Sequence, residues 1–576
     1  MKTKSLFAGL MVLVFAGLRG MCDSAQAGLP SQGMAWQVSE WTFATAKDYS
    51  AGGGDAVEFD VAFAQPGTGR TLVRPAFWDG GSTFRVRFAP MSAGRWSWKV
   101  RCPSDATLDG RSGTFDVRPY AGDLALYRHG FVTIVPGKKH FVHADGTPFL
   151  YLGDTHWGMY REEIDAPGPH AGKTGATSHF KYIVARRAQQ GFTVYQSEPI
   201  GARFDVRDGR VDAVDIPGFR HADLYYQAIA EAGLVHANAE FFFAAELTPA
   251  LAKDDAALAR LSRYWVARFG AYPVIWTLAQ EIDKDFYHER KAKHNFYTVA
   301  DNPWVRVAEY LHRYDAYAHP LSGHQQNTGT TTVHNSVFVA REVAARTGHT
   351  WWAAQWSPAL KGPVDWRVPR EYWASKRPAV NYEGRYCYLW TKNFGARAQG
   401  WISFLNGFCG YGYGAIDQWL YLSDYDVKRD SHDGVERITK ADKQVPWCAS
   451  LEFPSARQMG LLRTFLEKLP WWELEPDLGT GRFFAPAKGA VASVAAKGAD
   501  LYVGYFNGFS TATGRFAGCR PGVTYACTWF NPRTGEEVAV PVRCASERGD
   551  LALPEKPDAQ DWVFTARRIE HGKSNG

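Results

Sequence analysis

Short apolar stretches, each followed by an amphipathic helical stretch, recur eight times between residues 122 and 478. A chain that alternates strand and helix in this way forms a parallel sheet covered by helices, and eight such units are typical of a closed (β/α)8 TIM barrel. We therefore predict an α/β fold with this barrel at its centre and an active site at the carboxyl ends of its strands. The predicted strands are residues 149–153, 193–196, 235–243, 274–278, 321–324, 350–355, 379–382 and 400–406. The helices predicted between them include residues 179–190, 222–232, 256–269 and 304–319.

The segments on either side of the predicted barrel have the pattern of antiparallel sheets. Before the barrel, Phe84, Val86 and Phe88 alternate with polar residues. This alternation predicts a strand with one buried face and one face exposed to solvent. After it, apolar strands return with turns between them, such as residues 531–535. The predicted domains are a signal peptide over 1–27, a β-sandwich over 28–121, the barrel over 122–478 and a second β-sandwich over 479–570.

The N-terminus has the pattern of an export signal. Lys2 and Lys4 precede an apolar run over residues 6–18, and Ala25-Gln26-Ala27 has the small-x-small pattern of a cleavage site. We therefore expect a secreted or periplasmic protein, cleaved after Ala27. Lipoprotein cleavage before Cys22 is the alternative, which Arg19 and Met21 disfavour. No other stretch reaches the roughly 18 apolar residues that a membrane-spanning helix needs.

Composition and motifs exclude several classes of function. Lys and Arg number 65 against 59 Asp and Glu, for a net charge of +6 without a basic stripe, so nucleic acid is not an expected partner. The sequence lacks the common nucleotide-binding, zinc-binding and serine-hydrolase motifs, and it implies no cofactor and no metal. Removal of residues 1–27 leaves an odd number of cysteines, which is not typical of a disulfide scaffold. Aromatic residues make up 15% of the chain, and such rings either fill a core or stack on sugars.

Two glutamates follow predicted strands in positions suited to acid/base chemistry. Glu281 comes after the fourth strand, preceded by Gln280, and Glu383 ends the seventh strand. Charges at these strand ends face the mouth of a barrel, and strands four and seven lie across that mouth from each other. The alternative for either glutamate alone is a surface residue at the end of a strand.

A pair of carboxyl groups facing a substrate is what hydrolysis of a glycosidic bond requires. One protonates the departing oxygen while the other attacks the sugar carbon, and a separation of about 5–5.5 Å gives retention of configuration. We expect retention, with Glu281 as the protonated general acid/base and Glu383 as the ionised nucleophile, which the neighbouring Arg385 would favour.

Other strand ends carry polar and aromatic side chains suited to sugar hydroxyl groups and ring faces. We predict that Glu240, Gln325 and Asn327 lie near this mouth, and that a larger set binds substrate. That set is Asp154, His156, Trp157, Gln196, Glu198, Gln280, His324, Gln355, Trp356, Arg385, Tyr386 and Asn406.

Three other interpretations of these residues remain open. Each predicted substrate-binding residue could instead pack inside the barrel or behind the site, and Asp154, His156 and His324 could hold a metal, although their spacing does not support one. The protein could be a carbohydrate-binding or adhesion protein on a barrel that has lost catalysis. A polysaccharide lyase is the third, for which Tyr386 beside Arg385 is the only hint.

Several segments resemble one known family. Residues 148–157, Pro-Phe-Leu-Tyr-Leu-Gly-Asp-Thr-His-Trp, resemble the opening strand of the apiosidase-like glycoside hydrolases, and residues 410–419 are similar to that family's closing Gly- and Tyr-rich segment. Residues 76–80 and 87–96 resemble the immunoglobulin-like domain that commonly precedes such barrels, and residues 529–535 resemble the β-sandwich that often follows them.

The resemblance implies a retaining hydrolase with its acid/base on strand four and its nucleophile on strand seven, which correspond here to Glu281 and Glu383. The chain departs from the family at both places. Leu278-Ala279-Gln280-Glu281 stands where the family usually has Leu-Gly-Gly-Asp, and Asn381-Tyr382-Glu383 where it has Asp-Gly-Glu. The resemblance therefore implies the reaction class without implying apiose. The sequence as a whole predicts an exported retaining glycoside hydrolase that acts on a polysaccharide or oligosaccharide.

Overall fold

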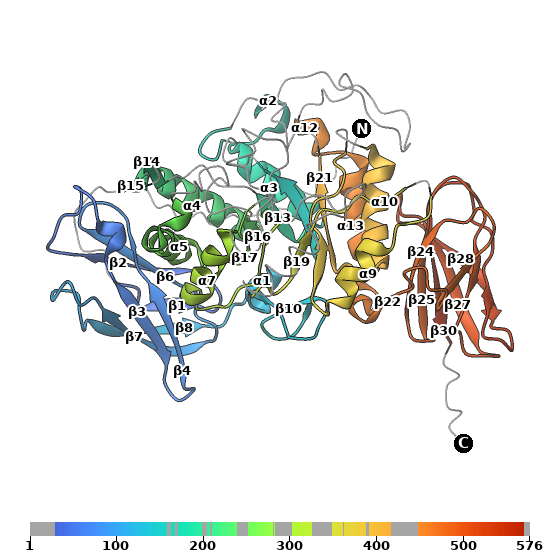
Figure 1. The fold of residues 1–576 in the computed structure, drawn as a ribbon, viewed down its shortest axis with the longest axis horizontal. Coiled ribbons are helices and arrows are strands. Elements are labelled where there is room, and N and C mark those ends of the chain that lie inside the picture. Colours follow the sequence, from blue (N-terminus) through green and yellow to red (C-terminus); the bar gives the residue numbers. More distant parts are fainter. Residues whose placement is uncertain are drawn as a thin grey trace, which may run out of the picture.

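The computed structural model describes residues 29–157, 163–167, 171–197, 204–207, 210–238, 251–279, 282, 302–324, 348–360, 362–387, 391–415 and 447–569. Figure 1 shows three parts in a row: a β-rich part at the N-terminal end in blue, a barrel with helices in the middle, and a β-rich part at the C-terminal end in red. Among the helices described, none is long and apolar enough to cross a membrane.

The N-terminal part is built from two sheets with aromatic rings between them, and all their strand pairs are antiparallel except β1 with β8, which is parallel. A five-stranded sheet has the order β1-β8-β7-β3-β4, and a three-stranded sheet has the order β2-β6-β5. Between the sheets, Phe63 stacks on Phe88 at 4.1 Å, and Trp41 packs on the edges of Phe63 and Phe115. The strands are β1 (Gln32–Met34), β2 (Ser39–Ala44), β3 (Asp60–Gln65), β4 (Arg70–Pro75), β5 (Phe77–Trp78), β6 (Thr83–Phe88), β7 (Gly94–Arg101) and β8 (Ser112–Arg118).

The central part is a parallel eight-stranded barrel, as the sequence predicts. Its strands are β12 (Tyr151–His156), β13 (Val194–Ser197), β16 (Val235–Asn238), β17 (Val274–Thr277), β18 (Leu321–Ser322), β19 (Trp352–Ala354), β20 (Ala379–Asn381) and β21 (Gly410–Gly414). They pair in the order β18-β17-β16-β13-β12-β21-β20-β19. A parallel bridge between His324 and Ala353 joins the two ends of this order and closes the ring. The amino-terminal end of the barrel is covered by a small sheet of β9 (Val132–Thr133), β10 (Phe141–His143) and β11 (Pro148–Phe149).

Helices surround the barrel, and one of them replaces a predicted strand. The predicted eighth strand, residues 400–406, is wrong, because these residues belong to the end of α10 and its cap, and the true eighth strand is β21. Every residue of α10 is buried, so its last turns read as a continuous apolar run, which periodicity alone cannot distinguish from a buried strand. The principal helices are α3 (His179–Gln189), α4 (Ile216–Glu231), α5 (Asp255–Phe269), α7 (Trp304–Tyr314), α9 (Arg367–Ala374), α10 (Asn393–Leu405) and α13 (Pro454–Glu467). Shorter elements are α1 (Ala125–Arg128), α2 (Ala171–Thr174), α12 (Trp447–Ser450) and the hairpin β14 (Phe204–Arg207) with β15 (Arg210–Val214).

The C-terminal part is a second pair of sheets with its own aromatic core. Six strands pair in the order β22-β24-β25-β30-β27-β28, and three in the order β23-β26-β29. Tyr502, Phe516 and Trp529 belong to the cluster of buried side chains at its centre. The strands are β22 (Glu475–Pro476), β23 (Phe484–Pro486), β24 (Ala492–Lys497), β25 (Leu501–Phe506), β26 (Gly514–Phe516), β27 (Thr524–Phe530), β28 (Glu537–Cys544), β29 (Leu551–Ala552) and β30 (Trp562–Arg568).

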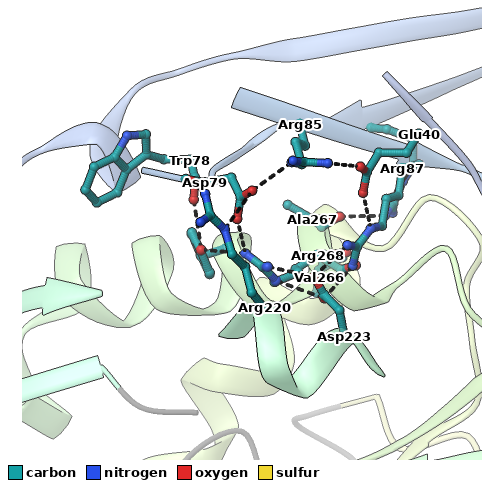
Figure 2. A network of polar contacts seen from close by, with 12 residues as sticks. Glu40, Trp78, Asp79, Arg85, Arg87, Arg220, Asp223, Val266, Ala267 and Arg268 are labelled. Carbon is teal, nitrogen blue, oxygen red and sulfur yellow. Dashed lines mark hydrogen bonds and ion pairs between the residues drawn. The ribbon is translucent and has the colours of Figure 1, made fainter. Parts of the chain in front are cut away.

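A buried ionic network joins the N-terminal part to the barrel (Figure 2). Arg87 of β6 donates two hydrogen bonds of 2.7 Å to the Asp223 carboxylate on α4, and Arg268 of α5 contacts the same carboxylate at 2.7 and 3.0 Å. Asp79, just after β5, accepts from Arg268 at 3.1 Å and from Arg220 at 3.2 Å. Arg87 of the N-terminal part is therefore paired with a carboxylate of the barrel, and Arg268 of the barrel is paired with carboxylates of both parts.

The C-terminal part is joined to the barrel in a similar way. Arg397 of α10 forms a two-pronged ion pair with Asp561, both bonds being 2.9 Å, and Tyr505 donates to the same carboxylate at 3.0 Å. Beside this pair, the ring of Trp401 lies parallel to that of Tyr505, with centroids 6.0 Å apart. The described contacts thus combine apolar packing with buried charge at both junctions.

We expect Asp223→Ala to lower the free energy of unfolding by about 3–5 kcal/mol, because it leaves the buried guanidinium groups of Arg87 and Arg268 without their shared anion. Urea unfolding of the full chain measures this change. The matched control is Asp116→Ala, which removes an exposed ion pair with Arg95 and should change the free energy of unfolding far less. Equal effects of the two substitutions would contradict the role given to the buried network.

Candidate active site

Glu383 lies just beyond β20, at the carboxyl end of the seventh barrel strand, and only 2% of it is exposed. The Tyr386 hydroxyl donates to its Oε1 at 2.5 Å, and the Gln355 amide donates to its Oε2 at 2.9 Å. His324 Nε2 lies 3.2 Å from the same Oε2. Side chains that follow three neighbouring strand positions, β18, β19 and β20, therefore meet on one carboxylate.

Tyr386 is itself held by a further donor. The indole N–H of Trp157, just after β12, donates to the Tyr386 hydroxyl oxygen at 2.7 Å. The tyrosine proton is therefore directed to Glu383, because the hydroxyl oxygen already accepts from Trp157. The relay fixes the orientation of the carboxylate from the first strand of the barrel.

His324 is electrically neutral in this site. Burial lowers its pKa to about 3, because the charged imidazolium would lose its hydration. Although Nε2 lies 3.2 Å from Glu383 Oε2, neither ring nitrogen forms a hydrogen bond among the described residues. His324 therefore packs against the carboxylate without adding a positive charge.

Tyr382 lies at the centre of a cluster of aromatic rings inside the barrel. The ring of Tyr382 lies 5.2 Å from that of His324, 6.0 Å from that of Trp157 and 6.0 Å from that of Trp351. All four side chains are buried, with exposed fractions of 3% or less. Tyr382 is a residue beside the site that strand-end position alone did not indicate, although it immediately precedes the glutamate.

Glycines on β21 make room for this cluster. A Cβ atom on Gly414 would come 2.0 Å from the ring of Tyr386, and one on Gly412 would come 1.9 Å from the carbonyl oxygen of Tyr382. Gly410 faces Tyr151 in the same way, at 2.6 Å. The spacing of two along Gly-Tyr-Gly-Tyr-Gly places all three glycines on the inner face of the strand, and this spacing was the sequence signal for the crowded interior.

Gln196 crosses the barrel interior below the site and is fully buried. Its amide donates to Thr155 Oγ1 at 3.0 Å and to the carbonyl of Tyr382 at 2.9 Å, and its carbonyl accepts from the Tyr151 hydroxyl at 3.0 Å. The side chain therefore links the first, second and seventh strands, and its hydrogen bonds are made inside the protein. Its expected contact with substrate is replaced by this bracing role.

Asp154 and His156 do not face the mouth, contrary to expectation. Asp154 forms a fully buried ion pair with Arg187 of α3 at 2.9 Å, and His156 Nδ1 contacts the hydroxyl of Tyr195. Tyr151 and Thr155 occupy the inner face of β12, so the alternate residues Asp154 and His156 point toward the helices. Among the described residues, no group of three or more His, Cys, Asp or Glu could hold a metal ion.

Trp356 and Asn406 also lie away from the predicted position. The ring of Trp356 stacks on Phe408 at 5.3 Å and is 1% exposed, so its face is covered by protein. Asn406 follows α10 and precedes β21, which puts it at the amino-terminal end of the barrel, where it donates to Ser493 of β24 at 2.8 Å. Its predicted place at the mouth of the barrel is wrong, because it depended on the incorrect strand 400–406.

The remaining predicted residues divide between described and undescribed parts of the chain. The backbone of Arg385 is held by Gln399 of α10 through two hydrogen bonds, of 2.7 and 3.1 Å, next to Glu383. The predictions that lie outside the described residues are Glu198, Glu240, Gln280, Glu281, Gln325 and Asn327.

The described residues on either side of positions 280 and 281 are tied to the site. His324 N–H donates to the Ala279 carbonyl at 3.2 Å, and Ile282 N–H donates to the His324 carbonyl at 2.9 Å. The same His324 carries the imidazole beside Glu383. The segment that follows the fourth strand is therefore anchored to the residue next to the carboxylate.

The match to a family model identifies the class of this enzyme as the glycosidases. An apiosidase-like catalytic domain model matches residues 136–473, and a domain of unknown function (DUF5060) matches residues 32–103. The chain belongs to the apiosidase-like family, and the resemblance noted in the sequence is confirmed. A comparison with curated proteins finds no match.

Solved structures share this fold. A protein from Bacteroides vulgatus, provisionally assigned to the glycoside hydrolases, superposes with a TM-score of 0.63 at 17% identity, covering 94% of this chain and all of its own. A glycoside hydrolase family 5 protein, also from Bacteroides vulgatus, superposes with a TM-score of 0.55 at 15% identity, covering 77% of this chain and 94% of its own. At these sequence identities the likeness shows a shared fold and nothing more specific.

We expect Gly414→Ala to lower kcat on an accepted substrate by about 10-fold or more, with a smaller effect on KM. The added methyl group forces the Tyr386 ring away, which weakens its hydrogen bond to Glu383, and a small displacement of a group in an active site lowers the rate. Tyr386→Phe should reproduce the loss without the steric change. Gly362→Ala is the control, since its Cβ would meet no atom within 4 Å. Wild-type kcat in both Gly414→Ala and Tyr386→Phe would show that the relay does not position the carboxylate.

Proposed function

We propose that this glycosidase is exported and cleaves a polysaccharide or oligosaccharide with retention of configuration, with Glu383 as nucleophile and Glu281 as general acid/base. The observation that supports this most strongly is the environment of Glu383. Its carboxylate is buried at a strand end and receives hydrogen bonds from Tyr386 and Gln355. Donors directed at a carboxylate favour its ionised form, which is the form that attacks.

The anchoring of the segment after β17 supports the role of Glu281. Ala279 and Ile282 both hydrogen-bond to the backbone of His324, whose side chain contacts Glu383. The described residues on both sides of Glu281 are thus bonded to the backbone of the residue beside Glu383, which supports the proposed pairing of the two carboxyl groups. We propose a separation of about 5–5.5 Å between the two carboxyl groups, the range of retaining enzymes.

The reaction then follows two displacements. In the first, a Glu383 oxygen bonds to the anomeric carbon while the bond between this carbon and the leaving-group oxygen breaks. Glu281 gives its proton to the leaving-group oxygen. In the second, Glu281 takes a proton from water, the water oxygen bonds to the anomeric carbon, and Glu383 is released. The Tyr386 and Gln355 donors hold Glu383 in the attacking orientation. Because His324 is neutral, it does not offset the negative charge of Glu383.

We expect Glu383→Ala and Glu281→Ala each to lower turnover by several orders of magnitude on an accepted glycan, because each removes a group that acts only in the reaction. Added azide should restore part of the activity of Glu383→Ala and give a glycosyl azide of inverted configuration, detected by NMR. With wild-type enzyme, NMR of the first-formed product should show the anomeric configuration of the substrate.

Circular dichroism of both variants is the control for folding. Wild-type activity in either variant would refute that residue's role. A first-formed product of inverted configuration would refute retention while leaving glycoside hydrolysis in place.

Export is supported by the N-terminal sequence. We expect the mature protein recovered from the periplasm or medium to begin at Gly28, and Edman sequencing measures this. Replacing Ala25 and Ala27 with Lys should block processing, since small residues are needed at the cleavage site. A mature chain that retains residues 1–27, or begins at Cys22, would contradict the proposed cleavage.

A further inference from the structure

A cleft lies where the barrel meets the C-terminal sheets, at the end of the barrel away from Glu383. Its volume is about 320 Å³, near the lower end for ligand pockets. It lies between the region before α9, the end of α10, the segment after β22, and strands β23 and β24. The lining residues that matter for its chemistry are Trp366, Asn406, Asp477, Leu478, Phe484 and Ser493.

The floor of the cleft is buried and polar at its centre, while its rim is exposed. Asn406 and Ser493 form part of the floor and are hydrogen-bonded to each other at 2.8 Å. The Nδ2 group of Asn406 is used by Ser493 and by the Ile402 carbonyl, whereas its Oδ1 accepts no hydrogen bond from the described residues. Asn406 as a whole is only 1% exposed, and its amide oxygen is an acceptor without a donor among the described residues.

The walls of the cleft are held in place before any ligand binds. The Arg370 guanidinium of α9 donates to the Leu478 carbonyl at 2.7 and 3.1 Å, which ties the segment after β22 to the barrel. The Asp477 carboxylate accepts from the backbone of Phe483 at 2.7 Å and of Gly481 at 3.2 Å, which shapes the same segment. A preformed cleft binds with less loss of conformational entropy than a mobile one.

Trp366 gives the cleft an aromatic wall. The ring is half-buried, and its Cε3 and Cζ3 atoms pack so closely on Gly479 that a Cβ there would lie 2.3 Å away. Gly479 has φ +71°, so both the backbone and the ring require glycine at this position. A rigid indole beside hydroxyl, amide and carboxylate groups is a combination that suits the apolar face and polar edge of a sugar ring.

We propose that this cleft is a second carbohydrate site, which binds one or two rings of a neutral glycan. The ligand class rests on the proposed action of the enzyme on glycans, and the location rests on the cleft itself. Among the described lining residues the only charged side chain is that of Asp477, so a uronate would meet a negative charge without a cation. Because the cleft and Glu383 lie at opposite ends of the barrel, the site holds the polymer without occupying the mouth.

The test is affinity electrophoresis of the full chain, inactivated by Glu383→Gln, through gels containing galactomannan, arabinoxylan, xyloglucan or polygalacturonate. At least one neutral polysaccharide should retard it, and Trp366→Ala should weaken that retardation about tenfold, the loss of one aromatic contact. Ala490→Trp, which fills the cleft and removes no contact, should weaken it similarly. Trp472→Ala is the matched control, since this tryptophan is exposed outside the cleft and should leave retardation unchanged.

The outcomes separate this site from the proposed function. In the active enzyme, Trp366→Ala should leave kcat/KM on a small chromogenic glycoside unchanged. Loss of hydrolysis in Glu281→Ala with retained, Trp366-dependent binding supports both proposals. Three outcomes would overturn the second site, whatever the hydrolysis assay shows. They are retardation that survives both Trp366→Ala and Ala490→Trp, retardation by polygalacturonate alone, and no retardation by any neutral polysaccharide.

Discussion

The position of Glu383 depends on how aromatic rings fill the inside of the barrel. Tyr151, Tyr382 and Tyr386 occupy an interior that is free of side chains along the inner face of β21, where glycines alternate. Tyr386 then reaches Glu383, Trp157 reaches Tyr386, and Gln196 links the strands beneath them. Because the rings are closely packed, each has one orientation. The packing therefore fixes the hydrogen bonds to the carboxylate before any substrate binds.

Buried charge has a different task in this protein. Arg87, Arg268 and Asp223 join the N-terminal sheets to the helices of the barrel, and Arg397 with Asp561 joins the C-terminal sheets. Such pairs add little net stability over apolar packing, but a misaligned pair leaves a buried charge uncompensated. We infer that these pairs set the orientation of the flanking parts, while the apolar contacts beside them supply most of the free energy. The cleft that contains Trp366 exists because one of these junctions is held in a fixed orientation.

The sequence predicts the barrel well because hydrophobic period and helix amphipathicity are local properties. Seven of its strands fall where the apolar stretches indicate, while residues 400–406 mislead because a helix buried on all sides has no polar face. Site residues were harder to predict, since position at a strand end does not reveal the direction of a side chain. Asp154 and His156 follow the right strand but alternate to its outer face, and only the partner Arg187 on α3 shows this. Tyr382 escaped notice because its role comes from rings far away in the chain.

The barrel is closed unevenly. Seven of its strand pairs are joined by ladders, whereas β18 and β19 are linked by the bridge from His324 to Ala353 and by Thr350, which bonds to Leu321. The ring is therefore easiest to open between these two strands, and the side chains just beyond them, His324 and Gln355, both contact Glu383. A sugar that contacted both side chains would link β18 to β19, so binding in the mouth would make the whole barrel more rigid.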